Sequence, residues 1–159
     1  MASAVRLTMH GEIKLKRWKL FGVIPVVSAS GSDVTRSAAG RVNIKSIWLP
    51  SALCSTDVAW TGIDDYHFRS QFFAHGEAAD ISCVVDSDGR LRSVSMPRWG
   101  NPGNRSFEYV AFGGTVEEER SFGGYTLPTR MRVGWHFETE RFESEGESFR
   151  VTIDDAVFR

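Results

Sequence analysis

The segment 40-GRVNIKSIWLPSALC-54 differs from the rest of the chain, which reads as a series of short strands. Apolar residues recur here, and in the ten residues before it, at the spacing of an amphipathic helix. Ser32 or Asp33 supplies a capping side chain, and Pro50 disfavours helical geometry at Leu49. We therefore predict one α-helix at about residues 32–49.

Strand signals surround this segment. Polar and apolar residues alternate with period 2 in many short stretches, and glycine, asparagine, aspartate or proline separates most of them. The stretches that we predict as strands are 6–16, 21–31, 58–63, 67–75, 79–85, 90–96, 106–112, 115–122, 129–139 and 147–158. The first two are expected to pair as a hairpin, and Gly113–Gly114 is interpreted as a turn.

One helix cannot cover both faces of such a sheet, and a sheet of that size tends to curl. We predict a mainly β protein: a single curved antiparallel sheet of about nine strands, a half-barrel or open barrel, wrapped around one α-helix. A chain of 159 residues is long enough for one hydrophobic core, so residues 1–159 are expected to form a single domain.

The bulk composition argues against several function classes. A net charge of -1 gives no general attraction to nucleic acid, and the four histidines are too scattered to suggest a metal site or a cofactor. The chain has no apolar run long enough for a membrane span and no signal-peptide pattern, so a cytoplasmic location is the default expectation. Cys54 and Cys83 lie among apolar residues, and we expect two buried free thiols.

Two cations lie inside the apolar sector of the predicted helix. Arg41 and Lys45 are four residues apart, so that side of the helix is either exposed to solvent or faces an acidic group. Asp155 is a candidate partner, because its register matches the inward set of the last predicted strand. The rest of the sector comprises Val34, Ala38, Val42, Ile44, Trp48 and Leu49, and the inward set comprises Phe149, Val151, Ile153 and Val157.

Aromatic residues supply candidate ligand contacts. Trp48, Trp60, Phe72 and Trp135 fall on segments that a curled sheet would bring near the helix, where they could equally fill the core. Arg98 lies where a predicted strand meets a proline-glycine turn. It either clamps an anionic head group or is exposed and stacked on its neighbour Trp99.

The order of short motifs along the chain resembles that of a widespread bacterial family of uncharacterised proteins, a domain of unknown function. The motifs are VRLTMHGEIKLK, KLFGVIPVVSASG, RVNIKSIWLPSAL, VAWTGID, MPRWG and GGYTLPTRMRVGW. The resemblance implies an Arg-x3-acid-x2-Trp-x-Pro helix motif, in which Lys45 replaces the acid. It also implies further N-terminal sequence with a membrane segment, so a membrane-associated location is an alternative. The predicted fold is similar to the half-barrels of bacterial lipoprotein carriers.

Three functions follow from these patterns. The first is non-catalytic binding of an apolar or amphipathic, lipid-like ligand in the concave face of the sheet, with no catalytic residues. The second is an enzyme whose acid and base come from Asp155 or from the DDYH segment, residues 64–67, although the place of that segment between two strands suggests a turn. The third is an interaction module that recruits a partner through a sheet edge. The oligomeric state is left open.

Overall fold

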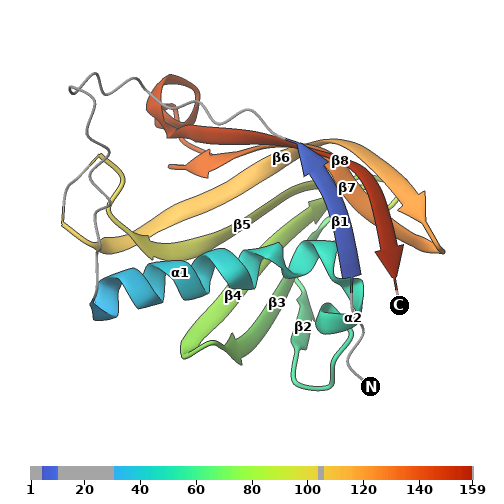
Figure 1. Ribbon diagram of the computed structural model, residues 1–159, viewed down its shortest axis with the longest axis horizontal. Helices are drawn as coiled ribbons and strands as arrows, with labels where there is room; N and C mark the ends of the chain where they lie inside the picture. The colour runs from blue at the N-terminus through green and yellow to red at the C-terminus, as the bar shows by residue number, and fades with distance from the viewer. Residues whose placement is uncertain (1–4, 11–30, 104–105, 159) are drawn as a thin grey trace.

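One antiparallel sheet dominates the computed structural model, which describes residues 5–10, 31–103 and 106–158 (Figure 1). Its eight strands are arranged in the order β1-β8-β7-β6-β5-β4-β3-β2. The strands are β1 Val5–His10, β2 Ala59–Gly62, β3 His67–Ala74, β4 Glu77–Val85, β5 Leu91–Gly100, β6 Glu108–Phe122, β7 Tyr125–Trp135 and β8 Glu147–Phe158. The mainly β fold is confirmed. The number of about nine strands is not, and most of the predicted strand at 21–31 lies outside the described residues.

The helix predicted at about residues 32–49 is present but divided into two pieces, and a third short helix follows it. The three elements are α1 Ser32–Ile44, the 3-10 helix η1 Lys45–Trp48 and the short α2 Pro50–Leu53, which we together call the helical segment. Pro50 ends one helical segment and begins the next, because its fixed φ suits the first turn of a helix. The N-cap is Gly31 and no side chain caps α1. Asp33, predicted as a cap, instead accepts a hydrogen bond from Trp99 Nε1 at 2.9 Å.

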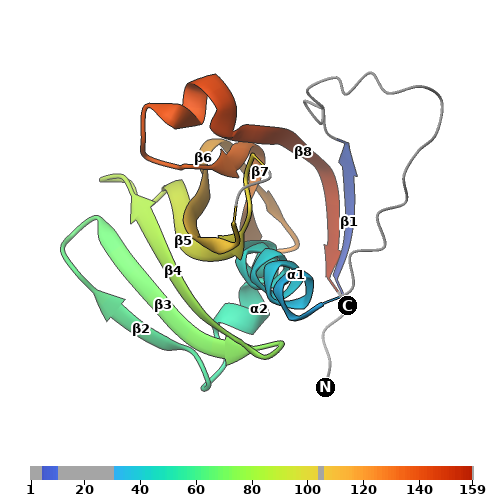
Figure 2. The ribbon, with the colours of Figure 1, turned by 90° about the vertical axis from the view of Figure 1, so that its left-hand side faces the viewer.

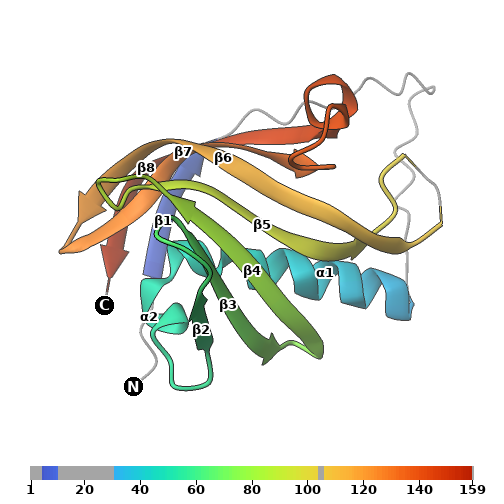
Figure 3. The same ribbon diagram turned by 180° about the vertical axis from the view of Figure 1, so that it is seen from behind.

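The sheet curves around the helical segment. Viewed from the end of α1, β2, β3 and β4 lie on one side of the helix, and β8 and β1 lie on the other (Figure 2). The view from behind shows β3, β4 and β5 passing across α1 (Figure 3). α1 packs on β4 and β5, and η1 contacts β7. The helical segment therefore lies in the concave face, as the sequence predicted.

The buried face of α1 differs from the predicted sector. Ala38 is exposed, and Val42 is 49% exposed, whereas Ala39, Asn43 and Ile44 are buried. The apolar core continues from Ile44 into the strands. Its buried members are Ile44, Ile47, Trp48, Ala79, Ile81, Cys83, Val94, Met96, Phe112, Val116, Met131, Val133, Val151 and Ile153.

Gly113 and Gly114 do not form the predicted turn. They lie within the long strand β6, which joins the two strands predicted at 106–112 and 115–122. A Cβ on Gly113 would lie 2.4 Å from the carbonyl oxygen of Val94. The glycines are needed for close packing against neighbouring strands, and the turn between β6 and β7 is made by Gly123 and Gly124, which have positive φ.

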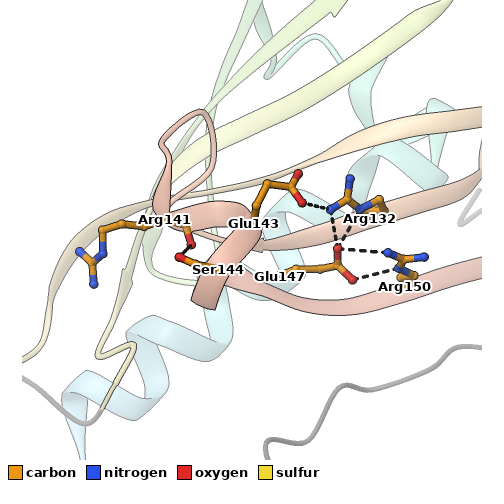
Figure 4. A network of polar contacts seen from close by, with 6 residues as sticks. All are labelled: Arg132, Arg141, Glu143, Ser144, Glu147 and Arg150. Atoms are coloured by element: carbon orange, nitrogen blue, oxygen red, sulfur yellow. Dashed lines mark hydrogen bonds and ion pairs between the residues drawn. The ribbon is translucent and has the colours of Figure 1, made fainter.

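A polar network joins β7, β8 and η2 Phe142–Gly146, a single π-helical turn (Figure 4). The Glu147 side chain is nearly buried and accepts hydrogen bonds from Arg132 Nε at 2.7 Å and from Arg150 Nε at 2.9 Å. Arg132 also donates to Glu143 at 2.6 Å. These two carboxylates raise the pKa of Arg132 above its ordinary value, so its charge is fixed. The network ties the turn before β8 to the neighbouring strand.

The two cysteines provide a test of burial. Cys83 is buried in the core and Cys54 is exposed, so the expectation of two buried thiols was wrong for Cys54, while both thiols are free. Burial raises the pKa of the Cys83 thiol to about 11, and the thiolate is the reactive form.

At pH 8 we expect a disulfide reagent to react with one thiol per chain in native protein and with two in denaturant. Rapid reaction of both thiols in the native state would contradict the position of Cys83.

Candidate functional site

An apolar cavity lies between the helical segment and the middle of the sheet. It has a volume of about 30 Å³. Ile44, Ile47 and Trp48 line it from the helical side, and Val94, Phe112, Gly113, Gly114, Met131, Val133 and Phe149 line it from β5, β6, β7 and β8. Arg41 and Lys45 complete the lining. The helix therefore does not fill the concave face.

Arg98 does not line this cavity, but its guanidinium lies on Phe112, which does. Arg98 continues the inward-facing series of Val94 and Met96 along β5, and only 8% of it is exposed. The guanidinium carbon lies 4.5 Å from the ring centroids of both Phe112 and Trp135. Nε and Nη2 donate to the carbonyl oxygen of Ser37 in α1, at 3.3 and 3.1 Å. Arg98 thus connects the helix with three strands.

Two glycines make room for this arrangement. A Cβ on Gly40 would lie 3.0 Å from Cγ of Arg98, so the arginine stem passes directly across the helix surface. A Cβ on Gly100 would lie 2.2 Å from the indole ring of Trp135. The stacked guanidinium therefore requires small residues on both sides.

The charge of Arg98 has no acidic neighbour among the described residues. None of their carboxylates forms an ion pair with Arg98, Arg41 or Lys45. Burial, and secondarily the nearby positive charge of Arg41, lower the pKa of the Arg98 guanidinium to about 10. Arg98 is still a cation at neutral pH. The alternative of an exposed Arg98 stacked on Trp99 was wrong, since Arg98 is buried and Arg36 lies over that ring at 4.0 Å.

Asp155 does not face the helix. The pairing of β8 with β1 shifts between Ile153 and Asp155, which reverses the inward and outward positions beyond that point. Ala156 is consequently buried, and Asp155 and Val157 are exposed. The Asp155 carboxylate accepts a hydrogen bond from the Ala156 amide at 2.9 Å. The predicted pairing with Arg41 or Lys45, both of which are exposed, is absent.

The predicted aromatic residues separate into different places. Trp48 is buried, and its Nε1 donates to the Pro128 carbonyl at 2.9 Å. Trp135 is half-buried against Arg98, whereas Trp60 is 48% exposed and donates to Leu53. Phe72 lines a separate open groove of about 400 Å³, between β3 and the other side of the helical segment. We name this second hollow the β3-side groove. Lys45, Leu49 and Leu53 also line it.

The DDYH segment forms a turn before β3. Asp64 accepts hydrogen bonds from the amides of Tyr66 and His67, and its carboxylate lies 2.7 Å from His67 Nδ1. The Tyr66 amide and the His67 ring hold the pKa of Asp64 below its ordinary value. Both Asp64 and His67 are exposed on this hairpin, so they line neither hollow beside the helix. Of the residues that the structure describes, no three metal-binding side chains are grouped.

A cluster that the sequence did not indicate fixes the first turns of α1. Arg36 donates to Glu77 at 2.7 Å and to the Tyr109 hydroxyl at 2.8 Å, and it stacks on Trp99. Trp99 in turn donates to Asp33. These residues come from α1, β4, β5 and β6, and only the curved sheet brings them together. In the sequence, the signal for this cluster was Trp99, the aromatic residue that follows Arg98.

A model of DUF6920, a family of unknown function, matches residues 9–158. The chain belongs to this family. DUF6920 membership confirms the predicted resemblance to uncharacterised proteins, while the bacterial origin and the helix motif stay predictions. No curated protein and no solved structure matches this DUF6920 chain. Across residues 5–10, 31–103 and 106–158, no helix is long and apolar enough to cross a membrane.

Trp48 and Trp60 form a matched pair for testing which tryptophan holds the helical segment of the DUF6920 chain in place. Trp48→Phe removes a buried donor from the Pro128 carbonyl, so we expect it to lower the free energy of unfolding by about 2 kcal/mol. Trp60→Phe removes an exposed hydrogen bond and should cost less than about 1 kcal/mol. Urea unfolding followed by circular dichroism measures both. Equal losses would contradict the placement of Trp48.

Proposed function

We propose that this DUF6920 chain binds an apolar or amphipathic, lipid-like ligand between the helical segment and the concave face of the sheet, without catalysing a reaction on it. The observation that supports this proposal is the apolar cavity beneath α1 and η1, which has two cations without carboxylate partners among the described residues in its lining. Small-molecule sites typically combine apolar walls with a few polar groups that fix orientation. This lining suits a ligand with a long apolar part and a polar end.

The cavity must widen to hold such a ligand. A volume of about 30 Å³ accommodates about two water molecules. Phe149 is half-buried where the cavity meets β8, and α1 packs mainly on β4 and β5. The cavity would therefore enlarge towards β8, by rotation of Phe149, without loss of the contacts between α1 and β4 or β5. The ligand's apolar part would then contact Val133, Phe149 and Met131.

Native mass spectrometry of the purified protein tests for ligand binding. We expect an added mass after incubation with dodecanol, and a larger bound fraction for Phe149→Ala, which removes the ring at the widening end. Phe73→Ala is the control, since Phe73 is exposed on β3 and does not line the cavity. If all three proteins appear only at the unliganded mass, the proposal fails.

Filling the cavity locates the site. Val94→Ile adds one methylene group to a lining residue, so we expect it to stabilise the unliganded protein by about 0.8 kcal/mol and to weaken dodecanol binding several-fold. Val151→Ile is the matched control, because Val151 is buried in the same core but does not line the cavity, and overpacking there should cost about 1–3 kcal/mol. Urea unfolding and dodecanol titration measure both effects.

The same titration distinguishes the cavity from the β3-side groove. Phe72→Trp enlarges a side chain that lines the β3-side groove and does not line the cavity. We expect this variant to bind dodecanol as the wild type does. A loss of binding in Phe72→Trp with full binding in Val94→Ile would place the ligand in the β3-side groove and contradict the cavity.

A further inference from the structure

Arginines elsewhere in the described residues are mostly paired with acids. Seven form ion pairs with carboxylates: Arg36, Arg69, Arg92, Arg130, Arg132, Arg141 and Arg150. Each of these seven has a more exposed side chain than Arg98. Arg98, whose charge is the most costly of these to desolvate, therefore has no acidic partner among the described residues.

The neutral groups around Arg98 use only part of its guanidinium. Nε and Nη2 donate to Ser37, and the two aromatic faces attract the positive charge. Nη1 makes no hydrogen bond with any described residue, and it is not one of their fully buried unpartnered atoms. Its two N–H groups are available to an acceptor that approaches from outside.

A second cation, Arg41, lies on α1 next to the residue that Arg98 crosses. Arg41 is one helical residue from Gly40, over which the Arg98 stem passes, and its charge is near enough to disfavour the charge of Arg98. Arg41 also lines the cavity together with Phe112, one of the two rings beneath Arg98. Like charges repel each other, and an anion that contacts both guanidinium groups would offset this repulsion.

We propose that Arg98 and Arg41 form an anion-binding site, which receives a carboxylate or phosphate group at the polar end of the ligand. This inference rests on the proposed function, since the apolar part of the same ligand would occupy the cavity. Guanidinium groups bind carboxylate and phosphate oxygens through charge-assisted hydrogen bonds, so an anion would supply the acceptor and the negative charge that no described residue supplies. Lys45, in the same lining, adds to the positive potential.

Four amphiphiles with the same dodecyl chain test the inference: dodecanoate, dodecyl phosphate, dodecanol and dodecyltrimethylammonium. We expect one or both anions to bind at least about tenfold more tightly than dodecanol, and the cation to bind more weakly than dodecanol. Whichever anion binds more tightly identifies the head group. Inorganic phosphate alone serves as a further probe. If it binds as tightly as dodecyl phosphate, the alkyl chain contributes nothing to binding, and a site that binds the head group and the chain of one ligand is overturned.

Variants assign the preference to residues. Arg41→Gln and Arg98→Met should each reduce the ratio of anion to dodecanol affinity about tenfold, because each removes a positive charge from the site. Arg120→Gln is the control, because Arg120 is exposed on β6 and stacks on Phe122, away from the cavity. If Arg98→Met does not fold, Arg41→Gln decides the result, since Arg41 is exposed.

The outcomes separate the two proposals. Equal affinity for all four amphiphiles overturns the anion site and leaves the proposed binding function intact. An anion preference that survives in Arg41→Gln also overturns it. If none of the four amphiphiles binds, the binding function fails and the anion site fails with it.

Discussion

The position of the helix in this sheet depends on a buried cation. Arg98 leaves β5 on the concave side, crosses α1 at Gly40 and donates to the Ser37 carbonyl, while its guanidinium lies on Phe112 and Trp135. A lysine could not replace these interactions, because only the planar guanidinium stacks on rings and donates sideways at once. One side chain thus connects α1 with β5, β6 and β7.

Further hydrogen bonds hold α1 and η1 near their outer ends. Arg36 and Asp33 join the beginning of α1 to Glu77, Trp99 and Tyr109, and Trp48 joins the end of η1 to Pro128. The cavity lies along the side of the segment that carries Arg41 and Lys45. A segment that is fixed at both ends and incompletely packed along one side is a suitable boundary for a binding site. In the proposed function, the apolar walls and the two cations, which form no ion pair with the described carboxylates, belong to one ligand site.

Much of the fold could be predicted from the sequence, because period-2 alternation and turn residues mark most strands directly. One helical interruption was also predicted, although the structure divides it and adds the π-helical turn η2. The expected size of the sheet predicted that it curls. The errors came from features that local patterns do not encode. Gly113 and Gly114 resemble a turn but allow close approach of neighbouring strands, and the irregular pairing after Ile153 reversed the expected orientation of Asp155.

The candidate site was predicted less completely. Arg41, Lys45 and Trp48 lie on the helical segment, as predicted. The predicted strand 90–96 stops before Arg98, so the sequence did not indicate that Arg98 continues the inward series of Val94 and Met96. The partners of Arg98 are distant in sequence, so neither its burial nor its stacking has a local signal. Gly40 within a helix and Gly100 at a strand end were the indirect signs, since each removes a side chain where another residue must pass.

The nuclear magnetic resonance signal of the Arg98 Nε–H group tests most directly whether this residue holds α1 in the concave face. Because Nε donates to Ser37 and the guanidinium lies on Trp135, we expect slow exchange with water and nuclear Overhauser effects to the indole protons. The exposed Arg41 provides the internal reference for fast exchange. An Arg98 signal that exchanges as rapidly as that of Arg41 and shows no contact with Trp135 would contradict the buried cation.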